Sequence, residues 1–226
     1  GRTVFTAINC TRIAIIAGIS FAFLAIWISR QGATAPGFDH SIHAWVMAHR
    51  TSTNIKFSRS VTWGGVTQVV LPVLIIVGVI AIEGGGTLTR RLKSGVLISL
   101  VASIGAYLGL QLNHLEGRVR PPLSDWAGTA GGPSFPSGHT TVAALFAASC
   151  AWVIATRVHV GWPRIALWTA AVFYAVAVGL SRIWLGVHWP TDVIGGWLYA
   201  LTWLSASAAV VLTIRKRWPR PLVRRS

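Results

Sequence analysis

Long uncharged stretches alternate with short polar segments along the chain. Each stretch holds 17 to 22 residues, which is enough for a helix to cross a hydrocarbon core of roughly 30 Å. The pattern predicts an all-α protein: a bundle of six transmembrane helices that forms a single domain over residues 1–226. We expect the first stretch to be a retained span, because no convincing cleavage site of small residues follows it. The stretches are Ile13–Ser29, Val61–Ile82, Ser94–Leu112, Thr140–Thr156, Ile165–Ser181 and Val193–Ile214.

The composition narrows the class of protein further. Hydrophobic residues make up 53% of the chain and charged residues only 11%, whereas an ordinary soluble domain is about 25% charged. This composition excludes a soluble enzyme, a disordered protein and a disulfide-rich secreted module. The two cysteines, Cys10 and Cys150, lie in or beside apolar stretches and match no zinc or redox spacing, so we expect them to be small buried apolar residues.

The charge is strongly positive but segregated. The chain carries 20 basic and 5 acidic residues, and the basic clusters flank apolar stretches, so membrane topology explains them better than a nucleic-acid partner. With the N-terminus inside, thirteen basic residues are cytoplasmic and seven lie on the opposite side. This bias predicts that both termini are cytoplasmic. The preference for arginine, seventeen against three lysines, favours a bacterial origin. The thirteen are Arg2, Arg12, Arg90, Arg91, Lys93, Arg157, Arg164, Arg215, Lys216, Arg217, Arg220, Arg224 and Arg225.

A short amphipathic helix is predicted within the outer segment 36–60. Asp39 is suited to the N-cap of such a helix. Ile42, Trp45, Val46 and His49 follow helical spacing on one face. We expect this helix to lie on the outer membrane surface. The histidines of the segment lack clear carboxylate or thiolate partners, so we expect solvated or packing roles for them rather than metal binding.

The predicted topology brings three polar segments to the same outer side. They are residues 113–121 after the third stretch, 136–139 before the fourth, and 181–192 between the fifth and the sixth. Polar residues at a membrane edge are costly, so their presence indicates a function.

The second of these segments has the properties of an anion site. Ser137 and Gly138 precede a helix start, where unpaired backbone N–H groups and the positive end of the helix dipole attract anions. Gly138 lets a ligand approach the backbone closely. His139 falls in the first turn, so we expect it to face the same anion.

The third segment combines a cation with an oriented histidine. The Arg182 guanidinium can bind two phosphate oxygens at once. His188 precedes Asp192 by four residues, so the carboxylate can accept the proton-bearing nitrogen of the imidazole. That bond would fix the tautomer, leave the other nitrogen free to attack, and stabilise the cation that forms.

The first segment adds further positive charge, from Arg120 and from the nearby Arg118. Arginines, a helix N-terminus and two histidines together describe a phosphate-transfer site. The chain has no acidic cluster to hold magnesium, so the arginines would neutralise the charge on the phosphoryl oxygens. We therefore expect chemistry that needs neither a metal nor another cofactor.

These motifs resemble those of the type 2 phosphatidic acid phosphatase superfamily. Its members carry a Lys-x6-Arg-Pro motif, a Pro-Ser-Gly-His motif and a Ser-Arg-x5-His-x3-Asp motif. The second is complete at Pro136–His139 and the third at Ser181–Asp192, in the family's order and at its spacing around two spans. The first departs from the pattern, because Asn113 stands where the family has lysine.

The resemblance implies roles for individual residues. His188 would be the nucleophile that forms a phosphohistidine, with Asp192 as its orienting partner. His139 would protonate the leaving oxygen and then activate water. Arg120, Arg182, Ser137 and Gly138 would hold the phosphoryl group. Asn113, at the position of the motif lysine, and Arg118 are further candidates for phosphate binding.

The resemblance also implies an enzyme in the cell membrane whose active site lies on the extracytoplasmic face. It would hydrolyse a lipid phosphomonoester or diphosphate, such as polyprenyl diphosphate, phosphatidylglycerol phosphate, phosphatidate or a polyprenyl phosphosugar. The same residues would also serve a phosphotransferase that passes phosphate from His188 to another hydroxyl. A non-catalytic lipid binder or transporter is a further alternative, and Asn113 is its only support.

Overall fold

The computed structural model describes residues 6–32, 35–81 and 88–217. Its secondary structure is entirely helical over these residues, which confirms the predicted fold class. Arg2 and the tail residues Arg220, Arg224 and Arg225, which entered the charge argument, lie outside the described residues. The α-helices are α1 (Ala7–Arg30), α2 (Gly37–His49), α3 (Ser52–Thr62), α4 (Thr67–Ala81), α5 (Leu88–Glu116), α6 (Gly138–Ala155), α7 (Trp162–Trp184) and α8 (Pro190–Arg217), and the 3-10 turns are η1 (Trp63–Gly65) and η2 (Leu123–Asp125).

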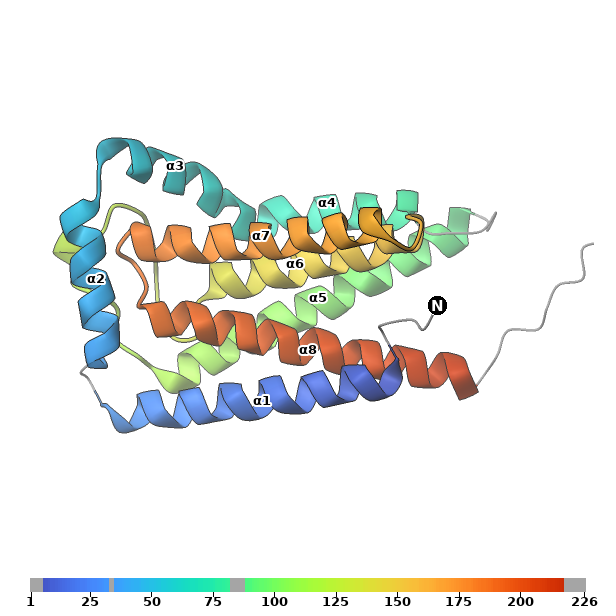
Figure 1. Ribbon diagram of the computed structural model, residues 1–226, viewed down its shortest axis with the longest axis horizontal. Helices are drawn as coiled ribbons and strands as arrows, with labels where there is room; N and C mark the ends of the chain where they lie inside the picture. The colour runs from blue at the N-terminus through green and yellow to red at the C-terminus, as the bar shows by residue number, and fades with distance from the viewer. Residues whose placement is uncertain (1–5, 33–34, 82–87, 218–226) are drawn as a thin grey trace, which may run out of the picture.

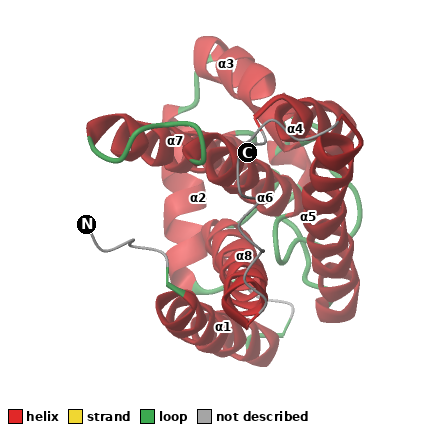
Figure 2. Cartoon of the chain, turned by 90° about the vertical axis from the view of Figure 1, so that its right-hand side faces the viewer, coloured by secondary structure: helices red, strands yellow, loops and turns green. Residues whose placement is uncertain are grey.

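The long helices run side by side and form one bundle (Figure 1). Helix α6 lies at its centre and packs against α4, α5, α7 and α8, whereas α1 packs along α8 (Figure 2). Helices α1, α6, α7 and α8, together with Gly95–Glu116 of α5, are long and apolar enough to cross a membrane. Large apolar side chains cover the outside of the bundle. On α1, Phe23 is 72% exposed, and a bilayer would cover such a surface.

The predicted second span differs from a straight helix. A bend of 54° at the turn η1 separates α3 from α4, so that these two helices make at most one broken span. Uncharged residues run through this bend without interruption, which is why the apolar pattern did not reveal it. Gly65 in η1 lies against α6, and a Cβ on it would come within 2.7 Å of the His139 Cβ. The bend therefore brings the chain into contact with a residue of the predicted site.

Close helix packing also depends on a pair of glycines in α4 and α5. A Cβ on Gly78 would lie 2.6 Å from the Cα of Gly95. Such contacts between small residues let two helix backbones approach closely, as is common in membranes.

All three predicted polar segments lie at one end of the bundle, and α2 runs across that end (Figure 1). The buried residues of α2 are Asp39, His43 and Val46. The sequence correctly predicted a short helix here. On the predicted apolar face, Val46 is buried and Trp45 is 54% exposed. The prediction of Asp39 as the N-cap was wrong, since Pro36 is the N-cap and Asp39 lies inside the first turn.

Candidate active site

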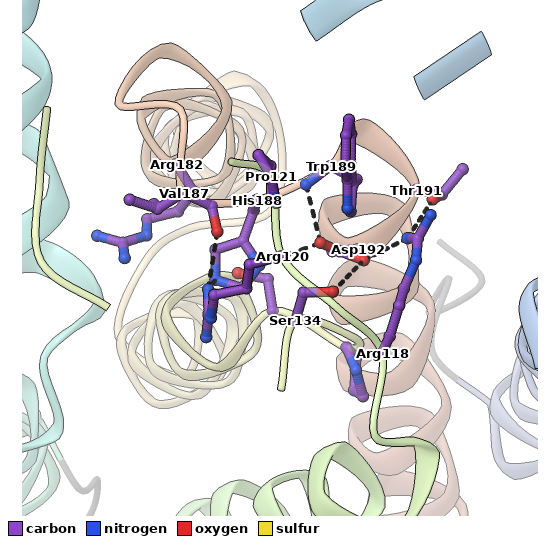
Figure 3. A network of polar contacts seen from close by, with 12 residues as sticks. Arg118, Arg120, Pro121, Ser134, Arg182, Val187, His188, Trp189, Thr191 and Asp192 are labelled. Carbon is purple, nitrogen blue, oxygen red and sulfur yellow. Dashed lines mark hydrogen bonds and ion pairs between the residues drawn. The ribbon is translucent and has the colours of Figure 1, made fainter. Parts of the chain in front are cut away.

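His188 lies in the short loop between α7 and α8, with partners on both ring nitrogens. Its Nδ1 is 3.3 Å from Asp192 Oδ2, and its Nε2 is 2.9 Å from Arg120 Nη1 (Figure 3). A guanidinium only donates hydrogen bonds, so Nε2 acts as the acceptor and Nδ1 carries the proton. The backbone N–H of Trp189 also donates to Asp192 Oδ2, at 2.8 Å, which fixes the carboxylate in the first turn of α8.

The surroundings of His188 keep its imidazole neutral. The side chain is almost fully buried. Burial and then the positive charges of Arg120 and Arg182 hold the pKa of His188 well below its usual range. A neutral imidazole has a lone pair on Nε2, which is the form that a nucleophile requires.

Arg120 approaches His188 from the loop after α5. Its Nη1 also donates to Val187 O at 2.8 Å, and its other nitrogens donate to the carbonyls of Gly131, Gly132 and Pro133 at 2.8–2.9 Å. Burial lowers the pKa of Arg120, and the Asp192 carboxylate opposes this effect.

Arg182 comes from the last turn of α7 and is 1% exposed. It donates through Nη1 to Thr62 Oγ1 at 2.8 Å and through Nη2 to Thr129 O at 3.1 Å. Its buried Nε has no acceptor among the residues that the structure describes. One donor of this guanidinium is therefore unsatisfied within the described part of the protein.

The α6 N-terminus supplies the second predicted segment of the site, residues 136–139. Ser137 is the N-cap residue, and its backbone N–H donates to Asp192 O at 3.0 Å, which ties α6 to α8. The Ser137 hydroxyl is buried and accepts a hydrogen bond from Thr140 Oγ1 at 2.9 Å. Gly138 faces open space, since a Cβ there would meet no atom within 4 Å. His139 and Arg182 both line one pocket, which has a volume of about 450 Å³.

Asn113 is occupied by the backbone of the loop before α6. Its Nδ2 donates to Pro133 O at 3.0 Å and to Pro136 O at 3.1 Å. Both amide hydrogens are therefore used within the protein. In these contacts Asn113 fixes the loop that leads into the α6 N-terminus.

Arg118 lies between two buried carboxylates. Its Nη1 donates to Asp192 Oδ1 and, at 2.7 Å, to Thr191 Oγ1, while its Nη2 donates to Asp39 Oδ2 at 2.6 Å. Asp39 also accepts from the backbone N–H of Thr191 at 2.9 Å and from its hydroxyl at 2.6 Å. Helix α2 is thus linked through Arg118 to the carboxylate that orients His188.

Sequence reasoning missed Asp39 and Thr191 as parts of this network. It also missed the pairing of His43 with Asp125, in which His43 Nε2 donates to Asp125 Oδ2 at 2.9 Å. This bond lowers the pKa of Asp125. The only signal in the sequence was the rarity of acidic residues, of which the chain has 5: each one in so apolar a protein needs a partner.

Comparison with known proteins relates both the sequence and the fold to one group. The family model of the PAP2 superfamily matches residues 95–216. A lipid A 1-phosphatase of Rhizobium etli is 33% identical over 149 residues, which are 57% of this chain and 59% of that protein. Phosphatidylglycerophosphatase B of Bacillus subtilis is 31% identical over 142 residues, 62% of this chain and 67% of that protein. The chain thus spans about three fifths to two thirds of the length of these curated relatives.

A solved structure resembles nearly the whole bundle. It is the crystal structure of a transmembrane PAP2-type phosphatidylglycerolphosphate phosphatase from Bacillus subtilis, with a TM-score of 0.72 and 25% identity. The likeness covers 92% of this chain and 98% of that one.

Proposed function

Because the chain belongs to the PAP2 superfamily, we propose that it is a bacterial integral membrane phosphatase that removes a phosphoryl group from a lipid through a phosphohistidine. One observation carries this proposal: His188 is held by Asp192 through Nδ1 and presents an unprotonated Nε2 to Arg120. A protein that merely binds lipid has no need of an oriented, neutral imidazole.

In the first step, a phosphoryl oxygen replaces His188 Nε2 as the acceptor for Arg120 Nη1. The freed lone pair of Nε2 attacks the phosphorus, and the bond between phosphorus and the leaving oxygen breaks. His139 donates a proton to that oxygen. Arg120, Arg182 and the N–H groups at the α6 N-terminus bind the phosphoryl oxygens and stabilise their charge. The free Nε of Arg182 and the open space at Gly138 support this assignment.

In the second step, water attacks the phosphohistidine and His139 accepts its proton. The bond between phosphorus and Nε2 breaks, which releases inorganic phosphate and restores neutral His188. Asp192 stabilises the imidazolium character of His188 in both steps.

We assign Asn113 and Arg118 to positioning rather than to phosphate binding. The hydrogen bonds of Asn113 with Pro133 and Pro136 support a role in holding the loop before Ser137. Arg118, with its two carboxylate partners, holds Asp192 in place. The buried hydroxyl of Ser137 supports phosphate binding through its backbone rather than its side chain.

The active site would lie on the extracytoplasmic face, with both termini in the cytoplasm. Among the described residues, Arg12 near the start of α1 and Arg215–Arg217 at the end of α8 belong to the opposite end of the bundle from the site (Figure 1). Positive charge of this kind favours the cytoplasmic side. The substrate classes that we propose are lipid A phosphate, phosphatidylglycerol phosphate, polyprenyl diphosphate and phosphatidate.

Phosphate release by the purified, detergent-solubilised protein tests this function. We expect release from at least one of these lipids, and we expect its rate to be unchanged by excess chelator, because the arginines supply the positive charge. Loss of activity on chelation, restored by a divalent cation, would contradict metal-independent catalysis. Protein that is folded but releases no phosphate from any of them would contradict the hydrolase proposal.

Replacing Gly65 by alanine should reduce turnover by displacing His139. The new Cβ would lie 2.7 Å from both the Cβ and the backbone oxygen of His139, so the start of α6 must shift. A misplacement of about 1 Å can cost on the order of 100-fold in rate. The measurement is kcat for phosphate release, with Gly37→Ala as the control, since a Cβ on Gly37 would meet no atom within 4 Å. Equal rates for the two variants would show that the contact between η1 and α6 does not position His139.

A further inference from the structure

The pocket beside His139 and Arg182 extends beyond the residues that the proposed reaction uses. Its wall continues along α3 and η1 with Arg59 and Trp63, and along the facing loop with Trp126 and Ala127. Its volume of about 450 Å³ exceeds what a single phosphoryl group needs. The additional space is available to the remainder of the substrate.

The pocket lies beside the proposed acid. Its described wall includes His139, the proposed acid, but not His188, the proposed nucleophile. In phosphoryl transfer the attacking and leaving atoms lie roughly in line on opposite sides of phosphorus. The group that departs from phosphorus therefore enters this pocket.

Arg59 supplies a second positive charge to the pocket wall. Its Nε donates to Ala127 O at 2.7 Å, which directs the guanidinium along the wall. Its two terminal nitrogens have no acceptor among the described residues, so they can still donate to a ligand. Thr62, three residues later on α3, accepts from Arg182 Nη1. Three residues of helix span about 4.5 Å, so the helix places Arg59 about one turn from the residue that contacts Arg182.

We propose that Arg59 binds a second phosphate that the leaving group carries, and that the enzyme therefore prefers lipids with two phosphates. This inference rests on the proposed function. Both a lipid diphosphate and phosphatidylglycerol phosphate have such a group. When the scissile bond of either breaks, His139 protonates the leaving oxygen while the second phosphate stays ionised and paired with Arg59. Phosphatidate has no second phosphate and gains nothing from this contact.

The test is Arg59→Gln, assayed as kcat/KM on farnesyl diphosphate, phosphatidylglycerol phosphate and phosphatidate. Glutamine places an N–H donor at the position of the arginine Nε, so the bond to Ala127 O can survive while the charge is lost. The loss of a hydrogen bond between charged groups should lower kcat/KM by about 10- to 100-fold. We expect that loss on one or both of the two-phosphate lipids and less than about threefold on phosphatidate. The lipid that responds identifies whether the second phosphate is adjacent to the scissile one or farther along the head group.

Lys56→Gln is the matched control, because it removes one charge from the same helix outside the described pocket wall. We expect it to leave all three activities unchanged. An equal loss on all three lipids in Arg59→Gln would mean that Arg59 acts only through the loop at Ala127, and would overturn the inference. No loss on any lipid would also overturn it. If the unmodified protein released no phosphate from any of the three, the proposed function itself would fail, and the inference with it.

Discussion

Replacing His188 by alanine should lower kcat for phosphate release by on the order of 10⁴-fold or more, since the loss of a nucleophile leaves only binding and charge stabilisation. The variant should still fold. Asp192 keeps its bonds with Arg118 and with the backbone N–H of Trp189, so no buried charge loses all its partners. Brief incubation with a ³²P-labelled lipid should label the parent protein with acid-labile phosphate and leave His188→Ala unlabelled.

Vanadate binding distinguishes a chemical defect from a collapsed site. Arg120 and Arg182 remain in His188→Ala, and we expect the variant to bind the anion with reduced affinity and to unfold in detergent at a temperature near that of the parent. Turnover within about tenfold of the parent would show that another residue is the nucleophile.

Replacing Arg118 by methionine should destabilise the protein by about 3–5 kcal/mol, which is the usual cost of removing one partner from a buried ion pair. Asp39 and Asp192 are fully buried, and Arg118 is 8% exposed. Methionine leaves both carboxylates in an apolar environment without their shared cation. The measurement is the unfolding free energy, or the thermal midpoint at fixed detergent concentration.

The double variant Arg118→Met with Asp39→Asn provides the control. It removes one of the two unpaired charges, and the oxygen of the new side-chain amide can still accept the bond from the backbone N–H of Thr191. We expect it to be more stable than Arg118→Met alone. A double variant that is no more stable than the single one would mean that Arg118 stabilises the protein by packing rather than by charge.

The sequence predicted the helical bundle because membrane spans are a local property. About twenty apolar residues in a row identify a span without knowledge of its neighbours. The bend at η1 was not predictable in this way. At the bend Gly65 packs against His139, a residue far from it in the chain.

The residues proposed for catalysis were also identified from the sequence, since their motifs are contiguous. Their partners were not. The sequence suggested Arg118 as a candidate phosphate ligand and Asp39 as a helix cap. In the fold these two residues form an ion pair, although they are 79 residues apart in the chain. The apolar spacing along α2 gave no sign that Asp39 and His43 would be buried. Arg118 and Thr191 hold the Asp39 carboxylate, and Asp125 accepts a hydrogen bond from His43 Nε2. The buried Nδ1 of His43 has no partner among the described residues.

The carbonyl groups of Thr129, Gly131, Gly132 and Pro133 have a consequence for product inhibition. They accept hydrogen bonds from Arg120 and Arg182, so a phosphate that reaches these arginines exchanges with carbonyl oxygens of the same chain. Such an intramolecular competitor acts at a high effective concentration. A lipid substrate offsets the competition with contacts outside the phosphoryl group, whereas inorganic phosphate has no such contacts. For the proposed reaction, the loop would thus favour departure of the product, and turnover would continue while free phosphate accumulates.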